Sequence, residues 1–179
     1  MSNPPDLRLH DLAQGTHPGL SAIQGAALAE AAAVCLEHVK HDPGVTLQVH
    51  GLARREYRVQ WDRVSEQSRR TWADLQEATE YGASAIAALL AADMLGLCIL
   101  SRSKKRTGFD YWLGPRTGVS ALFQETSRLE VSGILDGSPT DVRTRTREKL
   151  VQIGRVPSPL VGHVVVVEFG APVSEVSRT

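Results

Sequence analysis

Several kinds of residue are scarce in this chain, and each scarcity argues against a class of protein. Only two cysteines occur among the 179 residues, Cys35 and Cys98, and both lie in apolar stretches. Neither has the paired Cys or Cys/His spacing of a structural zinc site, so we interpret them as small buried hydrophobic residues in a reducing compartment. The formal net charge at pH 7 is zero, so overall charge does not indicate a nucleic-acid-binding protein.

Long apolar runs and the common nucleotide-binding motifs are also missing. The longest apolar run, around residues 83–92, is too short to cross a bilayer and has the pattern of an amphipathic helix. The start, MSNPPDLRLHD, lacks a basic segment followed by an apolar core, so we expect no signal peptide. There is no P-loop, dinucleotide fingerprint or GxSxG motif. These absences predict a cytoplasmic protein with no membrane partner.

The composition is that of an ordinary globular protein, with 42% hydrophobic and 22% charged residues. A chain of this length predicts a single compact domain. We expect an N-terminal extension over residues 1–70, packed on a core over residues 71–170, and a poorly ordered tail over residues 171–179. After an irregular start, the extension should contain an alanine-rich helix over residues 20–41 and a β-hairpin.

The core shows an alternation of helix and strand signals. Thr71 and Asp74 have the spacing of a capping box, which predicts Thr71 as the N-cap of a long helix that stops at Gly96. A second helix should begin after Ser138, with Pro139 in its first turn. The core strands are predicted over residues 97–102, 108–114, 128–135 and 162–169. The first three should be antiparallel, and the last, rich in valine, should be buried on both faces and parallel to the third.

Two of these strands each carry one carboxylate. Residues 108–114 read GFDYWLG and contain Asp110, and residues 128–135 read RLEVSGIL and contain Glu130. Side chains alternate between the faces of a strand, so each acid should point away from its apolar neighbours. If the two strands pair in register, both carboxylates lie on one face. That arrangement is costly unless a metal ion or a catalytic role makes use of it.

The αβββαβ order with acids at these places resembles the core of the PD-(D/E)XK nuclease superfamily, over roughly residues 71–169. The resemblance implies a restriction-endonuclease-like α/β fold with a mixed sheet. It also implies that Asp110 and Glu130 hold Mg²⁺ or Mn²⁺ for phosphodiester hydrolysis. An acid on the first helix often assists in that family. Here either Glu77 or Glu80 qualifies, and we rank Glu80 first because it lies nearer the middle of the helix.

The chain departs from the family pattern at Ser132, where the motif normally has a lysine. One interpretation supplies the cation from the second helix, where Arg145, Lys149 and Gln152 share one face. The resemblance then implies that Lys149 and Gln152 act with the two acids, as displaced residues do in some branches. The other interpretation is that catalysis has been lost and the fold kept. Lys149 could equally be an ordinary helix lysine whose stem covers apolar surface.

A local basic cluster predicts contact with the nucleic-acid backbone despite the neutral overall charge. It lies just before the first acidic strand and contains Arg102, Lys104, Lys105 and Arg106. A solvated loop is the simpler explanation of such a run. Similarly, Asp110 could cap a turn or pair with Lys104 or Arg106, and Glu130 could pair with an arginine across strands.

Taken together, these features predict a metal-dependent nuclease, and a bacterial defence or mobile-element setting would suit it. The alternative is a catalytically inactive subunit with a nuclease fold that binds nucleic acid or protein within a larger complex. An inhibitor or immunity-like protein is a third possibility, which no residue supports directly. A protein partner or a homo-oligomer could supply targeting, because no separate specificity domain is recognisable.

Overall fold

The computed structural model describes residues 3–116 and 126–179, and the fold is α/β with one eight-stranded mixed sheet. The strands are β1 (Asp6–Arg8), β2 (Val45–Gly51), β3 (Arg55–Gln60), β4 (Cys98–Arg102), β5 (Tyr111–Gly114), β6 (Ser127–Ile134), β7 (Gly162–Glu168) and β8 (Val173–Arg178). The helices are the 3-10 helix η1 (Leu9–Gln14), α1 (Ala22–His38), α2 (Glu66–Thr71), α3 (Leu75–Leu90), the π-helical turn η2 (Ala91–Leu95) and α4 (Pro139–Gly154).

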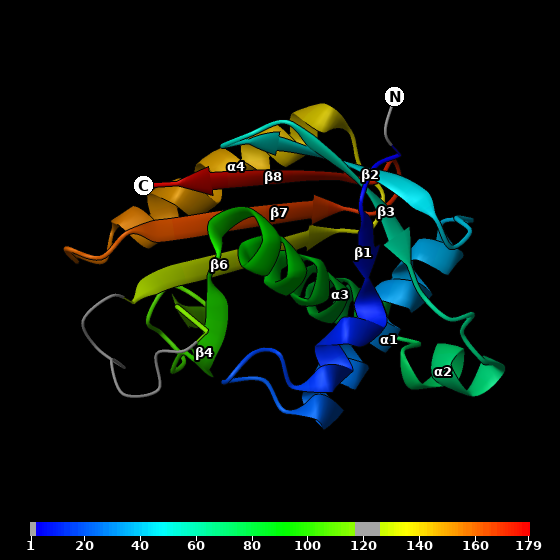
Figure 1. Ribbon diagram of the computed structural model, residues 1–179. Coiled ribbons are helices and arrows are strands. Elements are labelled where there is room, and N and C mark those ends of the chain that lie inside the picture. The colour runs from blue at the N-terminus through cyan, green and yellow to red at the C-terminus, as the bar shows by residue number, and fades with distance from the viewer. Residues whose placement is uncertain (1–2, 117–125) are drawn as a thin grey trace.

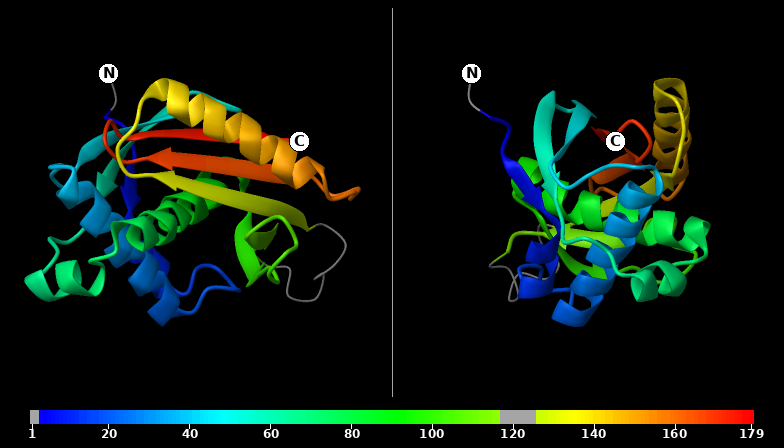
Figure 2. Two further views of the ribbon diagram at one scale, coloured as in Figure 1. Left: turned by 180° about the vertical axis from the view of Figure 1, so that it is seen from behind. Right: turned by 90° about the vertical axis from the view of Figure 1, so that its right-hand side faces the viewer.

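Helices cover both faces of the sheet. Helix α3 lies across one face with α1 beside it, and α4 lies across the opposite face, over β6, β7 and β8 (Figures 1 and 2). Strand β7 lies between the layers and is buried at every residue, as the valine run predicted. None of the helices in the described residues is both long and apolar enough to cross a membrane.

The strand order is β1-β3-β2-β8-β7-β6-β5-β4. As predicted, β4, β5 and β6 are antiparallel neighbours and β6 pairs with β7 in parallel. The predicted poorly ordered tail is wrong, because residues 173–178 form β8. Strand β8 pairs antiparallel with β7 and parallel with β2, so it joins the N-terminal hairpin to the rest of the sheet. Its Val176 is buried in the same hydrophobic cluster as the core of the sheet.

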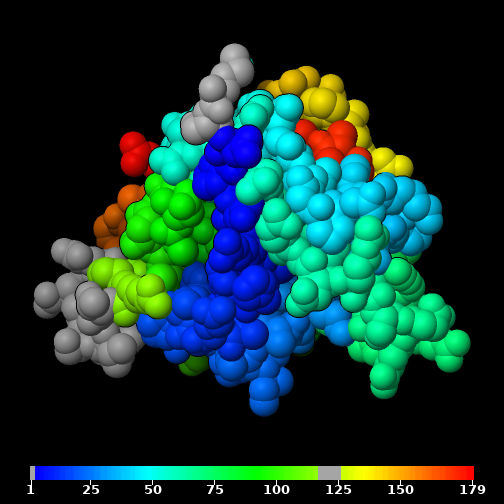
Figure 3. All heavy atoms as spheres, turned by 45° about the vertical axis from the view of Figure 1, so that its right-hand side comes forward, coloured from blue at the N-terminus to red at the C-terminus, as the bar shows by residue number. Residues whose placement is uncertain are grey.

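The N-terminal stretch is also more ordered than its prolines predicted. Strand β1 pairs with β3, and η1 follows it directly. In the space-filling view this blue segment runs over the surface between the cyan hairpin and green residues (Figure 3). Further on, Gly19 donates a backbone hydrogen bond of 2.8 Å to Ile99 of β4. The predicted helix over residues 20–41 and the predicted hairpin are confirmed as α1 and as β2 with β3.

The start of α3 differs from the predicted capping box. Thr71 ends the short helix α2, which the sequence did not indicate. Asp74 is the N-cap instead, and its Oδ1 accepts hydrogen bonds from the backbone N–H groups of Gln76 and Glu77 at 3.0 and 3.3 Å. The helix ends through η2 at Gly96, as expected. For α4 the prediction is confirmed, with Ser138 and Asp141 forming a reciprocal capping box.

Small residues allow α3 to pack closely on both of its neighbours. A Cβ atom on Gly82 would lie 2.9 Å from the Cα of Ala32 in α1, so the alanine-rich helices approach backbone to backbone. On the sheet side, a Cβ on Gly133 of β6 would lie 2.5 Å from the carbonyl oxygen of Thr79. The close approach at Gly133 brings the next residue of α3, Glu80, to the edge of β6.

Candidate functional site

Strand β6 extends beyond its partner β5, and this leaves an open edge. The two strands pair from Tyr111 opposite Leu129 to Leu113 opposite Ser127. One step further along the same register, Asp110 would lie opposite Glu130. The prediction that residues 108–114 are all strand is wrong, because β5 begins at Tyr111 and Asp110 precedes it. The segment that follows β5 falls largely on residues 117–125, outside the described part of the chain.

Beyond the end of β5, Asp110 forms the hydrogen bonds to β6 that a longer β5 would form. Its backbone N–H donates to the carbonyl of Leu129 at 2.8 Å, and its Oδ2 accepts from the backbone N–H of Val131, also at 2.8 Å. The carboxylate therefore satisfies a strand donor that β5 does not reach. Asp110 thus has a structural capping role, and that role turns its carboxylate toward the residue next to Glu130.

Glu130 lies in the middle of β6 and is only 4% exposed. Its Oε1 accepts from the ammonium of Lys149 at 2.6 Å and from the side-chain amide of Gln152 at 3.0 Å. The two α4 side chains also contact each other, with Lys149 Nζ donating to Gln152 Oε1 at 3.2 Å. The structure therefore brings together Asp110, Glu130, Lys149 and Gln152, the four predicted catalytic residues.

The environment of Glu130 disfavours its charge. Burial, reinforced by the nearby Asp110 carboxylate, raises the pKa of Glu130 from 4.5 to about 7. The hydrogen bonds and charge of Lys149, with the amide of Gln152, act in the opposite direction and limit the rise. A carboxyl group whose pKa lies near neutrality and whose partners are side chains is typical of a functional site.

Two cavities adjoin the acidic pair. One, of about 320 Å³, lies between α3 and α4 along the open edge of β6. The other, of about 330 Å³, lies under the loop that joins β4 to β5. Arg102, Asp110 and Glu130 line both of them. The acids therefore lie where the two cavities meet.

The helix acid can now be chosen between the two candidates. Both Glu77 and Glu80 are exposed, but only Glu80 lines the cavity between α3 and α4. The described residues contain no group of three or more His, Cys, Asp or Glu side chains arranged to hold a metal ion. Glu80 therefore faces the cavity without completing a three-ligand set, and its part in metal binding stays a prediction.

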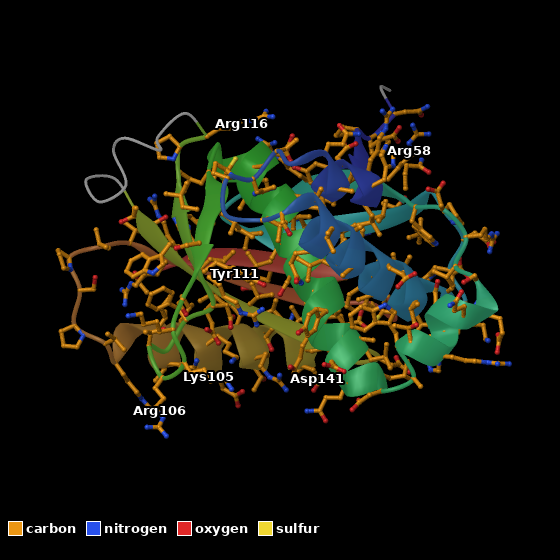
Figure 4. All side chains as sticks on the ribbon, turned by 90° about the horizontal axis from the view of Figure 1, so that it is seen from below. Arg58, Lys105, Arg106, Tyr111, Arg116 and Asp141 are labelled. Atoms are coloured by element: carbon orange, nitrogen blue, oxygen red, sulfur yellow. The ribbon has the colours of Figure 1, made fainter. Side chains whose placement is uncertain are left out.

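The basic cluster forms an ordered turn at one side of the site. The backbone N–H of Ser103 donates to the carbonyl of Asp110 at 2.8 Å, and the hydroxyl of Thr107 donates to the carbonyl of Lys104 at 2.8 Å. Lys105 and Arg106 extend from this loop beside α4, and Arg106 points away from the molecule, whereas Tyr111 lies inward (Figure 4). Neither Lys104 nor Arg106 forms an ion pair with a carboxylate in the described residues, so the alternative pairing with Asp110 is not seen.

Some contacts of the site were not anticipated from the sequence. The guanidinium Nη1 of Arg145 donates to the hydroxyl of Ser132 at 3.0 Å, so α4 places a cation at the position that lacks the motif lysine. Buried Arg128 donates to three backbone carbonyls, those of Ile153, Val156 and Leu160 at 3.0 to 3.3 Å, and so anchors the C-terminal end of α4. The alternation of Arg128, Glu130 and Ser132 on one face of β6 was the available signal.

The donor set is compatible with a small hard cation. Asp110 Oδ1 and Glu130 Oε2 accept no hydrogen bond from the described residues. Mg²⁺ keeps several waters and is commonly held by one or two carboxylates together with a substrate phosphate. Asp110 and Glu130 are therefore the residues that could hold it.

No protein-family model, no curated protein and no solved structure matches this chain. The chemistry of the site is accordingly inferred from its own residues.

Proposed function

We propose that the protein is a metal-dependent nuclease that hydrolyses phosphodiester bonds at the Asp110–Glu130 site. The observation that carries the proposal is the convergence of these two acids with Lys149, whose ammonium lies 2.6 Å from Glu130. Two acids beside a lysine, at the junction of two cavities with basic residues in their walls, suit a polyanionic substrate.

The order of the elements supports the resemblance to the PD-(D/E)XK superfamily. From α3 onward the chain runs helix, three antiparallel strands, helix and parallel strand. The first acid precedes the second of these strands, and the second acid lies within the third. A restriction-endonuclease-like core is therefore the finer fold assignment that we propose.

The residues divide the chemistry among themselves. Bound at the two carboxylates, Mg²⁺ or Mn²⁺ would polarise a phosphoryl oxygen and lower the pKa of a coordinated water. Lys149 holds a positive charge against Glu130 and is the group placed to stabilise negative charge on a phosphate or an attacking water. Gln152 ties Lys149 to Glu130 and, by donating to the carbonyl of Gly108 at 3.4 Å, links α4 to the basic loop.

The test is cleavage of labelled single- and double-stranded DNA and RNA in Mg²⁺ and in Mn²⁺. Asp110→Asn and Glu130→Gln remove one negative charge each and keep an oxygen acceptor, so the amide introduced at position 110 can still accept from the backbone N–H of Val131. We expect both variants to lose at least about 100-fold in cleavage rate, since ligand loss should exceed the effect of outer-shell changes.

Glu77→Gln is the matched control, because Glu77 is an exposed acid of α3 that lines neither cavity beside the acidic pair. It should cleave at the wild-type rate. Cleavage that persists in both Asp110→Asn and Glu130→Gln would contradict the proposed site.

A catalytically inactive, nucleic-acid-binding subunit is the second candidate, and Ser132 is the observation that favours it. Its hydroxyl accepts a hydrogen bond from Arg145, and a serine at this position supplies none of the positive charge that the motif lysine would bring to β6. Binding of DNA or RNA by the wild-type chain without cleavage of any substrate in either metal would favour this candidate over the enzyme.

A further inference from the structure

We propose that Arg145, oriented by Ser132, is a phosphate-binding residue, and that with the loop of residues 102–106 it forms a two-sided groove for one nucleic-acid strand. The strand would cross the acidic pair, with one phosphate at Arg145 and others at the loop. This inference rests on the proposed function, because it assumes that the substrate is a polynucleotide.

The position of Arg145 carries the first step. Its Nη1 donates to Ser132 Oγ at 3.0 Å, and the serine is buried, so the guanidinium is held at one point of the cavity wall. A guanidinium has five N–H donors, and this contact uses one of them. Arg145 also contacts one carboxylate, but loosely: Arg145 Nε lies 3.6 Å from Glu148 Oε2, and the Glu148 side chain is largely exposed. Arg145 therefore keeps donors for an oxyanion.

The surroundings of Arg145 carry the second step. Lys149 lies one helical turn further along α4, and Arg102 reaches the same cavity from β4. Lys149 forms an ion pair with Glu130, whereas the guanidinium of Arg102 lies over the Tyr111 ring, 5.8 Å from its centre. Two arginines, one from β4 and one from α4, thus line a cavity along the open edge of β6. Arginine is well suited to bind phosphate, because its planar donors can engage two oxygens at once.

The second cavity is the reason for proposing a nucleic-acid strand as the ligand and not a single phosphate group. It shares Arg102, Asp110 and Glu130 with the first, and its outer wall contains Lys104, Lys105 and Arg106. Cations therefore lie on both sides of the acids. A free phosphate would need only one side, but a strand that presents its acid-bound phosphate in the middle would use both.

The experiment measures binding separately from cleavage. Fluorescence anisotropy of a labelled single-stranded oligonucleotide of about 12 nucleotides would be followed in EDTA over a series of salt concentrations. Arg145→Gln should weaken binding about tenfold and reduce the slope of log K against log salt by about 0.7, the value for one lost contact to a single strand. A variant with Lys104, Lys105 and Arg106 changed to Gln should show a larger loss of slope.

Matched variants separate orientation from charge. Arg147→Gln removes the same charge from an exposed position of α4 that lines neither of the two cavities beside the acids, and it should bind within about twofold of wild type. Ser132→Ala should weaken binding about threefold, the effect of one lost hydrogen bond. The double variant Ser132→Lys with Arg145→Ser moves the cation from α4 to β6 and should recover most of the loss seen in Arg145→Ser.

The outcomes are distinct. If Arg145→Gln binds no more weakly than Arg147→Gln, or if Ser132→Ala binds like wild type, the assignment is overturned. If a mononucleotide competes as well as the oligonucleotide, the ligand is a free phosphate group and the strand-spanning groove is overturned. If binding depends on Arg145 as predicted but the chain cleaves nothing in Mg²⁺ or Mn²⁺, the proposed groove is supported and the proposed nuclease activity is contradicted.

Discussion

Two buried glutamates on neighbouring parallel strands have opposite surroundings. Glu130 of β6 is 4% exposed, and among the described residues its carboxylate accepts hydrogen bonds only from side chains, those of Lys149 and Gln152. Glu168, at the end of β7, is 1% exposed, and within the part of the chain that the structure describes its carboxylate accepts only from backbone N–H groups, those of Gly137, Gly170 and Ala171 at 2.5 to 3.2 Å. One carboxylate borders two cavities, and the other closes the turn between β7 and β8.

The difference separates an acid that is held by the backbone from an acid that is held by side chains beside two cavities. The three backbone N–H groups that donate to Glu168 belong to two turns, so this carboxylate holds both turns in place. The partners of Glu130 are long side chains that can turn toward a ligand, and burial together with the nearby Asp110 carboxylate raises its pKa. Burial by itself would rank both residues alike, and the identity of the donors separates them.

Replacing each glutamate in turn should change cleavage very differently, and this is the largest effect that we expect. Glu130→Gln should lower the cleavage rate at least about 100-fold. Glu168→Gln keeps one oxygen acceptor at a position that lines neither of the two cavities beside the acids, so the folded variant should retain cleavage. Parallel rate measurements in Mn²⁺ check this, and equal losses in the two variants would erase the distinction.

For stability the order of the two positions should be reversed, with the larger effect at Glu168. Glu168→Ala removes the acceptor of three partly buried backbone hydrogen bonds, so the free energy of unfolding should fall by about 2–3 kcal/mol. Glu130→Gln should change it by no more than about 1 kcal/mol, because Lys149 is partly exposed and can reach water. Urea unfolding monitored by circular dichroism gives both values. A larger loss in Glu130→Gln than in Glu168→Ala would reverse our assignment.

The pH dependence of stability should carry the signature of Glu130. Its pKa is raised from 4.5 to about 7, so between these values the native state holds a proton that the unfolded chain has released. The contribution of this group to stability therefore falls as pH rises from about 4.5 to 7. Unfolding of wild type and Glu130→Gln, measured across that interval, should show a flatter profile in the variant. Parallel profiles would contradict the raised pKa.

Replacing Asp74, an exposed acid that also accepts from the backbone, should give the smallest effect that we expect. Asp74 also accepts from two backbone N–H groups, but it caps α3 in contact with water. Asp74→Ala should destabilise the protein by about 1 kcal/mol, the usual value for an N-cap. Thr71→Ala is the control, since Thr71 is not the cap, and its thermal midpoint should stay close to wild type. If Thr71→Ala is the more damaging change, the capping box predicted from sequence is correct after all.

Local patterns predicted most of the secondary structure. Alternation located β2, β3 and β6, the valine run identified β7, and the Ser138–Pro139 signal placed the start of α4. These features succeed because they act over a few residues, through strand periodicity and through backbone donors that a neighbouring side chain can satisfy. The candidate acids were found for the same reason, since each stands out within a short strand pattern.

The errors arose where distant segments supply the stabilisation. Residues 173–178 have no strong strand signal, and they are ordered because β2 and β7 pair with them from both sides. Asp110 was assigned to a strand because its neighbours alternate, yet β5 starts after it and its side chain caps β6. The Arg145–Ser132 contact joins residues of α4 and β6 that no local spacing relates.

Composition, periodicity and caps are properties of neighbours in the chain, so the order of residues is enough to tell which residues carry charge and where helices and strands can form. Which charges meet depends on how the distant segments pack. The parallel pairing of β6 with β7 lays α4 across the face that carries Glu130 and Ser132, and Gly133 lets α3 close the other side. Lys149 therefore meets Glu130, and Arg145 stands at the place where β6 has a serine.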